Sequence, residues 1–436
     1  MRNAYRRESY SASNAVEKAA CIRGFSAGGD TFERMNSSSA IRAISEPSYL
    51  RRAWGEISKK NKRSQGVDNV TLQAFRQNLD HNLSEISASL RSGNFKFNRL
   101  RAHAIERAGK KSRPIQIATI RDRVVMKALA MFVGPCFQAY DLECSYAFIK
   151  GRGVKSAMAR VKGLIAGGNK HYFEADIINF FGSVDRQTLW KMFAAKIRHR
   201  SLLPLLQQCF ELELENLESY KTEFQDLFVG ADSGIPQGGM LSPMLANFYL
   251  HYFDRRLTER GFNLVRYADD FVVMCSSEQE ALQAYSLSKD VLKTLGLAIH
   301  PLEPKSKSRV GYYPKDGLMF LGVRFEGCDV YPTNQVIDRF QTKVRDILKR
   351  NSGDSLFKTL QRLTNLVNGW GHCYRDMRVT QTYQRLDQFL KGAVEQYLKN
   401  LGIHLSGENR RRQLKLLGIP SLVAMVEHSA AVVGNK

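Results

Sequence analysis

The sequence predicts an α+β fold in which an antiparallel sheet, with acidic residues at its strand ends, lies between two helical regions. Apolar residues recur at three- and four-residue steps in 71–91 and 121–132, as they do on one face of a helix. Short apolar runs bounded by polar turns gather between about 170 and 330, which favours strands there. Helical periodicity then returns in 335–350, 355–368 and 380–401.

Three other segments are expected to be less regular or to form turns. Residues 100–117 alternate in polarity and end in a basic stretch, which indicates a basic β-hairpin. Residues 234–239 are rich in helix breakers and precede a helix expected over 241–256. Residues 1–45, rich in Ser, Ala and Arg, are expected to form a loosely ordered lead-in.

The most informative residues are Tyr267-Ala268-Asp269-Asp270. They lie between the apolar runs 263–265 and 271–274, a pattern that predicts a β-hairpin with two carboxylates at its tip. Adjacent like charges repel, and a divalent cation would neutralise them. Two acids in an ordinary exposed turn would explain the same four residues about as well.

A third acid shifts the balance toward a metal site. Residues 170–178 are rich in strand formers, and Asp176 lies near their end, before the aromatic pair Phe180-Phe181. A strand-end Asp and a hairpin-tip Asp pair can chelate two Mg²⁺ ions roughly 3.5–4 Å apart, the geometry used for in-line phosphoryl transfer. We therefore expect two Mg²⁺ ions as cofactors, with Mn²⁺ able to replace them.

Composition indicates a polyanionic ligand. The 436 residues carry a formal charge of +23, and a field of this sign concentrates nucleic acids; basicity for solubility alone is the alternative. No run of about twenty apolar residues is present, so we expect no membrane association. The seven cysteines are scattered without C-x-x-C spacing, which argues against a zinc module or a disulfide framework and favours the cytoplasm.

The order of these regions is that of fingers, palm and thumb in a right-hand polymerase. The predicted parts are an N-terminal extension (1–45), fingers (46–169), a catalytic palm (170–334), a helical thumb (335–401) and a C-terminal tail (402–436).

Short blocks in collinear order then identify a family resemblance. These blocks are Gln65–Asp68, Lys111–Ile115 with Ile120–Arg123, Ser145–Phe148 with Gly151–Gly153, Glu174–Phe181, Gly234–Pro243, Arg266–Asp270, Pro304–Lys307, Phe320–Gly322, and Asn368–Trp370 with Tyr374. From about residue 60 to 400 the chain resembles the reverse transcriptases, specifically the bacterial lineage similar to group II intron proteins, with a maturase-like thumb. Each block is short, but their common order makes a chance match a poor explanation.

The resemblance implies roles for individual residues. The catalytic acids would be Asp176, Asp269 and Asp270, and the metal site would comprise these three with Ile177. Lys111, Arg113 and Arg152 would hold the incoming triphosphate, since guanidinium groups bind phosphate bidentately. A solvated basic hairpin is the other interpretation of the first two.

The remaining implied roles concern the nucleotide and the primer. Phe181 would be a steric gate that collides with a 2′-hydroxyl, with Phe180 in the core, and Gln237 would touch the nucleotide or the template. Lys305 would either protonate the departing pyrophosphate or simply bind phosphate. The residues expected at the primer or template are Tyr267, Ala268, Gly238, Leu321 and Gly322.

Missing motifs narrow the expected function. No DNA-binding or Cys-rich nuclease region is visible after the thumb, and the Val-Thr-Gly and Asn-Ala-x-x-His motifs typical of retrons are absent. The chain therefore resembles the free-standing, defence-associated bacterial reverse transcriptases. That resemblance implies cDNA synthesis from dNTPs on a cognate structured noncoding RNA, in antiphage defence.

Two alternatives and several questions stay open at this stage. An RNA-dependent RNA polymerase is one alternative, which Phe181 opposes. A group II intron-type maturase that binds RNA in splicing or retromobility is the other. The template RNA, the priming mode and the oligomeric state are not determined by the sequence.

Overall fold

The computed structural model describes residues 37–59, 64–107, 110–230, 233–326, 329–349, 355–374, 377, 379–404 and 417–425. Most of the predicted N-terminal extension and C-terminal tail lies outside the described residues.

The chain forms two compact units, residues 1–153 with 173–310 and residues 154–172 with 311–436. Each unit is described by itself below. The division falls inside two strands, β3 (His171–Asp176) and β6 (Arg309–Tyr312). The boundaries of fingers, palm, thumb and flanking segments stay predictions.

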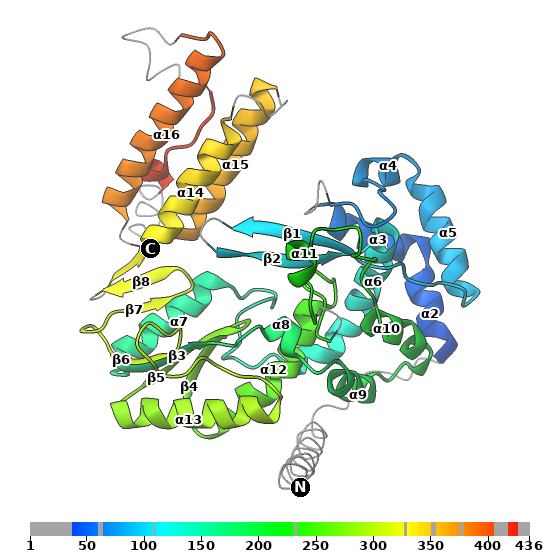
Figure 1. The fold of residues 1–436 in the computed structure, drawn as a ribbon, viewed down its shortest axis with the longest axis horizontal. Coiled ribbons are helices and arrows are strands. Elements are labelled where there is room, and N and C mark those ends of the chain that lie inside the picture. Colours follow the sequence, from blue (N-terminus) through cyan, green and yellow to red (C-terminus); the bar gives the residue numbers. More distant parts are fainter. Residues whose placement is uncertain are drawn as a thin grey trace, which may run out of the picture. The chain divides into compact units, whose positions relative to one another are not determined.

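Helices and one hairpin make up the N-terminal part of the first unit (Figure 1). Its elements are α2 (Ser37–Ser45), α3 (Pro47–Ser58), α4 (Leu72–Gln77), α5 (Leu79–Arg91), β1 (Arg101–Arg107), β2 (Lys110–Ile117), α6 (Ile120–Val133) and the 3-10 helix η1 (Gly134–Tyr140). The antiparallel pairing of β1 with β2 confirms the predicted basic hairpin.

Two expectations for this region need correction. Residues 37–45 are not loosely ordered: they form α2, which buries Ala40 and Ile44 completely. The spacing of these two apolar residues, four positions apart, was the signal for a helix. The helix predicted over 71–91 is two helices that meet at Asn78, whose backbone leaves the helical region.

A four-stranded sheet of order β4-β5-β3-β6 carries the acidic residues. Strands β4 (Asn263–Tyr267) and β5 (Asp270–Cys275) pair antiparallel with Tyr267 opposite Asp270, which confirms the predicted hairpin. Helices α12 (Ser242–Glu259) and α13 (Glu278–Thr294) pack against these two strands (Figure 1). Phe271, Val272, Val273 and Met274 of β5 are all fully buried, so both faces of this strand are covered, and the Phe271 ring packs against Phe253 of α12.

Strands do not dominate residues 170–330 as expected, because helices fill most of the intervening chain. Besides α12 and α13 these are α8 (Phe180–Ser183), α9 (Arg186–Lys196), the 3-10 helix η2 (Arg200–Leu202), α10 (Leu203–Phe210) and α11 (Thr222–Asp226). The buried side chains Leu189, Met192 and Phe193 of α9 follow a three- and four-residue spacing, the period that distinguishes a helix from a strand.

The second unit is mainly helical, with a small antiparallel sheet. Its elements are α7 (Val154–Ala166), β7 (Leu318–Phe320), β8 (Val323–Glu326), β9 (Asp329–Pro332), α14 (Asn334–Ile347), α15 (Leu356–Tyr374) and α16 (Thr380–Asn400). The last three confirm the predicted C-terminal helices. Their packing centres on Trp370, whose ring contacts Phe340, Tyr374 and Tyr383. Helices with antiparallel sheets confirm the α+β class, and none of the described helices is long and apolar enough to cross a membrane.

Candidate active site

The sheet brings the three predicted acids together. Asp176 is the last residue of β3, and the next residue, Ile177, donates its backbone N–H to the carbonyl of Asp269 at 3.0 Å. Asp269 and Asp270 form the tip and first strand residue of the neighbouring β4–β5 hairpin. A strand end and a hairpin tip that are distant in the sequence therefore meet at one point.

Burial and mutual repulsion make it unfavourable for all of these carboxylates to be ionised at once. Burial, followed by the charges of Asp176, Asp269 and Glu174, raises the pKa of Asp270 to about 8. Burial and Asp176 also raise the pKa of Asp269, while the guanidinium of Arg113 and the ammonium of Lys307 oppose that rise. A cluster of this kind favours the binding of a cation.

Two basic side chains already balance part of this charge. Lys307 forms an ion pair with the Asp176 carboxylate, and Arg309 forms one with Glu174. A role was predicted for Lys305 but not for Lys307, which lies two residues further along the same lysine block. Lys307 lies two residues before Arg309, which begins β6. In an extended segment, residues two apart face the same side, and this spacing was the available signal.

The donor set at this point suits Mg²⁺. Aspartate oxygens are hard ligands, and Mg²⁺ takes few protein carboxylates because it keeps several waters and substrate phosphates. The apolar side chain of Ile177 has no ligand atom, so only its backbone carbonyl could bind an ion. Within the described part of the chain, no three acidic, imidazole or thiol groups are arranged as a preformed metal site.

A buried arginine stabilises the β4–β5 hairpin. Arg266, in the middle of the apolar strand β4, is fully buried and donates to both carboxylate oxygens of Asp254 at 2.6 and 2.5 Å. Its other N–H groups bond to Asn247, to the Ser145 hydroxyl and to the Ala268 carbonyl. The sequence analysis missed this role, although an arginine inside an apolar strand was a signal for a buried ion pair.

The bond to Ala268 stabilises an unfavourable turn. Ala268 and Asp269 form a two-residue hairpin loop, and Ala268 has a φ of 59°, a left-handed conformation that costs an L-residue free energy. The Arg266 guanidinium donates to the Ala268 carbonyl at 3.0 Å. The buried arginine thereby fixes the turn that presents both aspartates.

The β1–β2 hairpin and the loop of residues 234–239, called here the glycine-rich loop, meet beside Phe181. The Gln116 N–H of β2 donates to the Gln237 carbonyl at 2.9 Å, and the Ile235 N–H donates to the Phe181 carbonyl at 2.8 Å. Gly238 has a φ of 100° and lies against Ile115 and Gln116, so it allows the close approach of loop to strand. Gln116, Ile235 and Gln237 line a small pocket of about 80 Å³.

The aromatic pair divides as predicted in burial. Phe180 is buried in the core, which confirms that part of the expectation, whereas Phe181 is only half-buried and lies edge-on to Phe180 at 5.2 Å between ring centroids. Phe181 is therefore partly accessible, and its backbone carbonyl is bonded to the glycine-rich loop. Its role as a gate stays a prediction.

The predicted phosphate-binding residues differ in their surroundings. Arg113 is exposed on β2 and close enough to Asp269 to influence its pKa. Lys111 lies on β2, and its side chain is outside the described part. Arg152 donates through one nitrogen to the carbonyls of Leu142 and Ser145, so it also holds the loop that contains them.

The other predicted residues lie on turns or strand ends. Lys305 is exposed with a left-handed φ of 66°, and Tyr267 ends β4. Leu321 and Gly322 form the β7–β8 turn of the second unit, both with positive φ. The roles expected of these residues at the nucleotide and the primer stay predictions.

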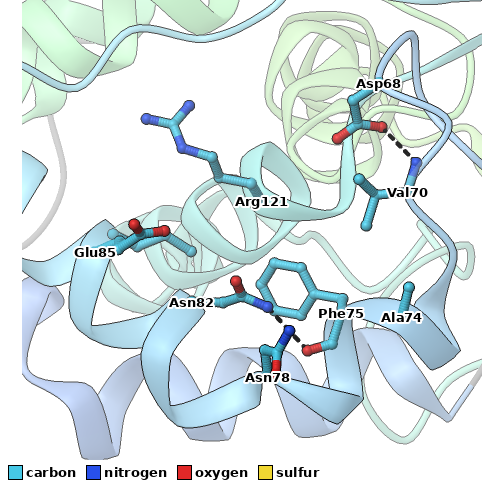
Figure 2. A pocket seen from close by; sticks show the side chains of 9 residues that line it. Asp68, Val70, Ala74, Phe75, Asn78, Asn82, Glu85 and Arg121 are labelled. Carbon is cyan, nitrogen blue, oxygen red and sulfur yellow. Dashed lines mark hydrogen bonds between the residues drawn. The ribbon is translucent and has the colours of Figure 1, made fainter.

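A separate cavity of about 350 Å³ lies at the N-terminal helices of the first unit (Figure 2). Its lining includes Asp68 of the Gln65–Asp68 block and Arg121, near the start of α6 (Figure 2). None of its lining residues belongs to the carboxylate cluster.

Comparison with known proteins agrees with this geometry. Residues 105–325, just over half of the chain, match the family described as reverse transcriptase (RNA-dependent DNA polymerase). Residues 337–401 match the maturase-specific domain of group II introns. The chain therefore belongs to the reverse transcriptase family, whose right-hand fold is α+β.

Individual relatives cover only parts of the chain. Protein YkfC of Escherichia coli K12 is 29% identical over 50% of this chain and 57% of its own length. The group II intron-encoded protein LtrA of Lactococcus lactis subsp. cremoris is 26% identical over 58% of this chain and 39% of its own. The retron Ec73 reverse transcriptase of Escherichia coli is 28% identical over 35% of this chain and 46% of its own. The matched part of the chain thus spans less than two thirds of the length of each of these relatives.

Solved structures are more distant. A chain of a partial Cas6-RT-Cas1–Cas2 complex has 24% sequence identity and a TM-score of 0.36, covering 58% of this chain and 41% of its own length.

The buried ion pair generates a stability prediction. Arg266→Met should lower the free energy of unfolding by about 3–5 kcal/mol, because it leaves the Asp254 carboxylate buried without its partner. The double variant Arg266→Met/Asp254→Leu should recover most of that loss. Urea denaturation of each variant measures the effect.

The exposed ion pair between Arg91 and Glu46 provides a matched control. Arg91→Met should change the free energy of unfolding by less than about 1 kcal/mol. An equally small change for Arg266→Met would show that the buried arginine is not the support of the hairpin.

Proposed function

We propose that this protein is an RNA-directed DNA polymerase that extends a primer by Mg²⁺-dependent nucleotidyl transfer. The observation that carries this proposal is the meeting of Asp176 with the Asp269–Asp270 tip, joined by the Ile177–Asp269 hydrogen bond. Membership in the reverse transcriptase family supports it independently. A pure RNA-binding protein would gain nothing from clustered carboxylates that repel the RNA backbone.

The reaction joins the primer to a deoxynucleotide. The 3′-oxygen of the primer loses its proton to water and attacks the α-phosphorus, and the bond from that phosphorus to the oxygen that bridges it to the β-phosphate breaks, which releases pyrophosphate. Mg²⁺ bound by the aspartates would supply charge stabilisation to the attacking and leaving oxygens. The residues of the chain position the substrates and provide the negative cluster that holds the cation.

Basic and aromatic side chains around the cluster would select and orient the nucleotide. Arg113 would bind the triphosphate, because its guanidinium is exposed within electrostatic reach of Asp269. Lys307 would leave Asp176 when a cation arrives and then face the phosphates. Phe181 would lie under the sugar and exclude a 2′-hydroxyl.

A second candidate function is that of a maturase. The observation in its favour is the match of residues 337–401 to the maturase-specific domain of group II introns. This function needs RNA binding without DNA synthesis, so an Asp269→Ala variant that still promotes splicing of a bound intron would support it.

The cellular role is proposed from resemblance. We place the polymerase in antiphage defence, copying a cognate structured noncoding RNA into cDNA. Sequencing the nucleic acid that copurifies with wild-type protein would identify the template, the start site and the product. Recovery of intron RNA alone would favour the maturase.

Removal of one carboxylate tests the polymerase directly. Asp269→Ala should reduce extension of a DNA primer on an RNA template by roughly a hundredfold or more, because several kcal/mol of charge stabilisation is lost. Gel-based extension assays with purified protein measure this. Asp290→Ala, on the exposed side of α13, should extend at the wild-type rate, and a loss below about tenfold for Asp269→Ala would count against the assignment.

The Lys307–Asp176 ion pair predicts an effect on Mg²⁺ affinity. Because the ammonium competes with a cation for Asp176, Lys307→Met should strengthen Mg²⁺ binding by up to about fivefold, the size expected of an exposed ion pair. Calorimetric titration of Mg²⁺ into the protein without nucleic acid measures it. Lys305→Met serves as the control, and an unchanged or weaker affinity in Lys307→Met would contradict the competition.

The gate assignment predicts altered sugar selection. Phe181→Val should raise ribonucleotide incorporation relative to deoxynucleotide incorporation by about tenfold or more, because the smaller side chain leaves room for a 2′-hydroxyl. Single-nucleotide extension kinetics with each substrate provide the ratio. Phe180→Leu, in the core, should leave the ratio unchanged while lowering stability; the same ratio in wild type and Phe181→Val would rule out the gate.

A further inference from the structure

Phe148 has an unusual combination of exposure and backbone conformation. Its side chain is 56% exposed, and its φ is 63°, in the left-handed region that is unfavourable for a bulky aromatic residue. Burial of the ring does not compensate for this conformation. Residues held in such a conformation cluster at functional sites, where the surrounding structure fixes them.

The surrounding loop is held firmly against the catalytic hairpin. The Tyr146 N–H donates to the Arg266 carbonyl at 2.9 Å, and the Arg266 N–H donates to the Cys144 carbonyl at 2.8 Å. The Asn247 side chain donates to the Ala147 carbonyl at 2.9 Å, inside the protein. The residue immediately before Phe148 is therefore fixed by a buried bond.

Arg152 closes the loop from its other end. Its guanidinium donates to the Ser145 carbonyl at 2.8 Å, so the chain on both sides of Phe148 is tied to the same short segment. Ala147 and Tyr146 are buried, whereas Phe148 and Lys150 are exposed. The loop thus presents an aromatic ring and a nearby cation to solvent, while hydrogen bonds hold its backbone on both sides of the ring.

The position of the loop indicates which strand of nucleic acid would meet it. The segment 144–146 runs beside β4, at the sheet edge away from β3. Three strand spacings separate it from Asp176, about 14 Å in total. A primer end held at the carboxylates would not reach that edge, so we infer that the other strand of a primer–template duplex is the one that meets this loop.

We propose that the Phe148 ring is a stacking platform for an unpaired base of the template RNA next to the primer terminus. An aromatic face stacks on every base, and a neighbouring lysine attracts the phosphate backbone. This inference rests on the proposed polymerase function, because that function defines which strand is the template. The left-handed backbone turns the ring outward, toward the nucleic acid and away from the core.

Base fluorescence tests the platform without any chemistry. The probe is a DNA primer annealed to an RNA template whose single-stranded overhang carries 2-aminopurine at one of its first three positions, mixed with protein in the absence of dNTPs. Stacking on Phe148 should quench one of these positions. Phe148→Gly and Phe148→Ala should abolish that quenching and weaken binding of the primer–template by about tenfold. Phe148→Trp should keep the quenching and the wild-type affinity.

Phe148→Gly separates binding from folding. Glycine adopts a positive φ without cost, so this variant should unfold at the wild-type temperature or above it. Phe357→Ala, which removes another exposed ring from the ordinary helical backbone of α15, should leave the quenching unchanged. A clear drop in unfolding temperature for Phe148→Gly would identify the ring as structural and overturn the proposal.

The remaining outcomes are also decisive. Wild-type quenching in Phe148→Gly would overturn the platform, even if the protein extends primers normally. Absence of primer extension by the wild type would instead contradict the polymerase function. The fluorescence result would then still show whether Phe148 stacks on a base, since binding is measured without extension.

Discussion

The bidentate pairing of Arg266 with Asp254 is the interaction on which the arrangement of the site depends. It lies fully inside the protein and joins α12 to β4. The same guanidinium reaches the Ser145 hydroxyl and the Ala268 carbonyl, so a single side chain links a helix, the loop that carries Phe148 and the turn that carries two aspartates. A buried charge is tolerated here because each of its nitrogens has a partner.

A second constraint is the excess of negative charge at the meeting point of β3 and β5. Carboxylates from three positions along the chain repel one another, and burial raises the pKa of Asp270 further. Lys307 supplies a compensating charge from the loop before β6. Part of the negative charge of the cluster is therefore balanced within the chain itself.

Much of this could be predicted from the sequence, and the exceptions have physical causes. The hairpin around Asp269 follows from two apolar runs that flank a polar turn, and the strand ending at Asp176 follows from its strand-forming residues; both are confirmed. The helices between Phe180 and Asp226 were missed because short apolar runs fit either period. Arg266 and Lys307 were missed because each acts on residues distant in sequence, which local patterns do not reveal.

The strand β4 lies at the margin of its sheet, where unpaired backbone groups can recruit strands from other molecules. The backbone hydrogen bonds from Arg266 to Cys144 and Tyr146 pair some of the backbone groups on that edge. The loop beside the aspartates therefore has a protective consequence: it shields an apolar strand from intermolecular pairing, and its loss would favour aggregation as well as altering the site.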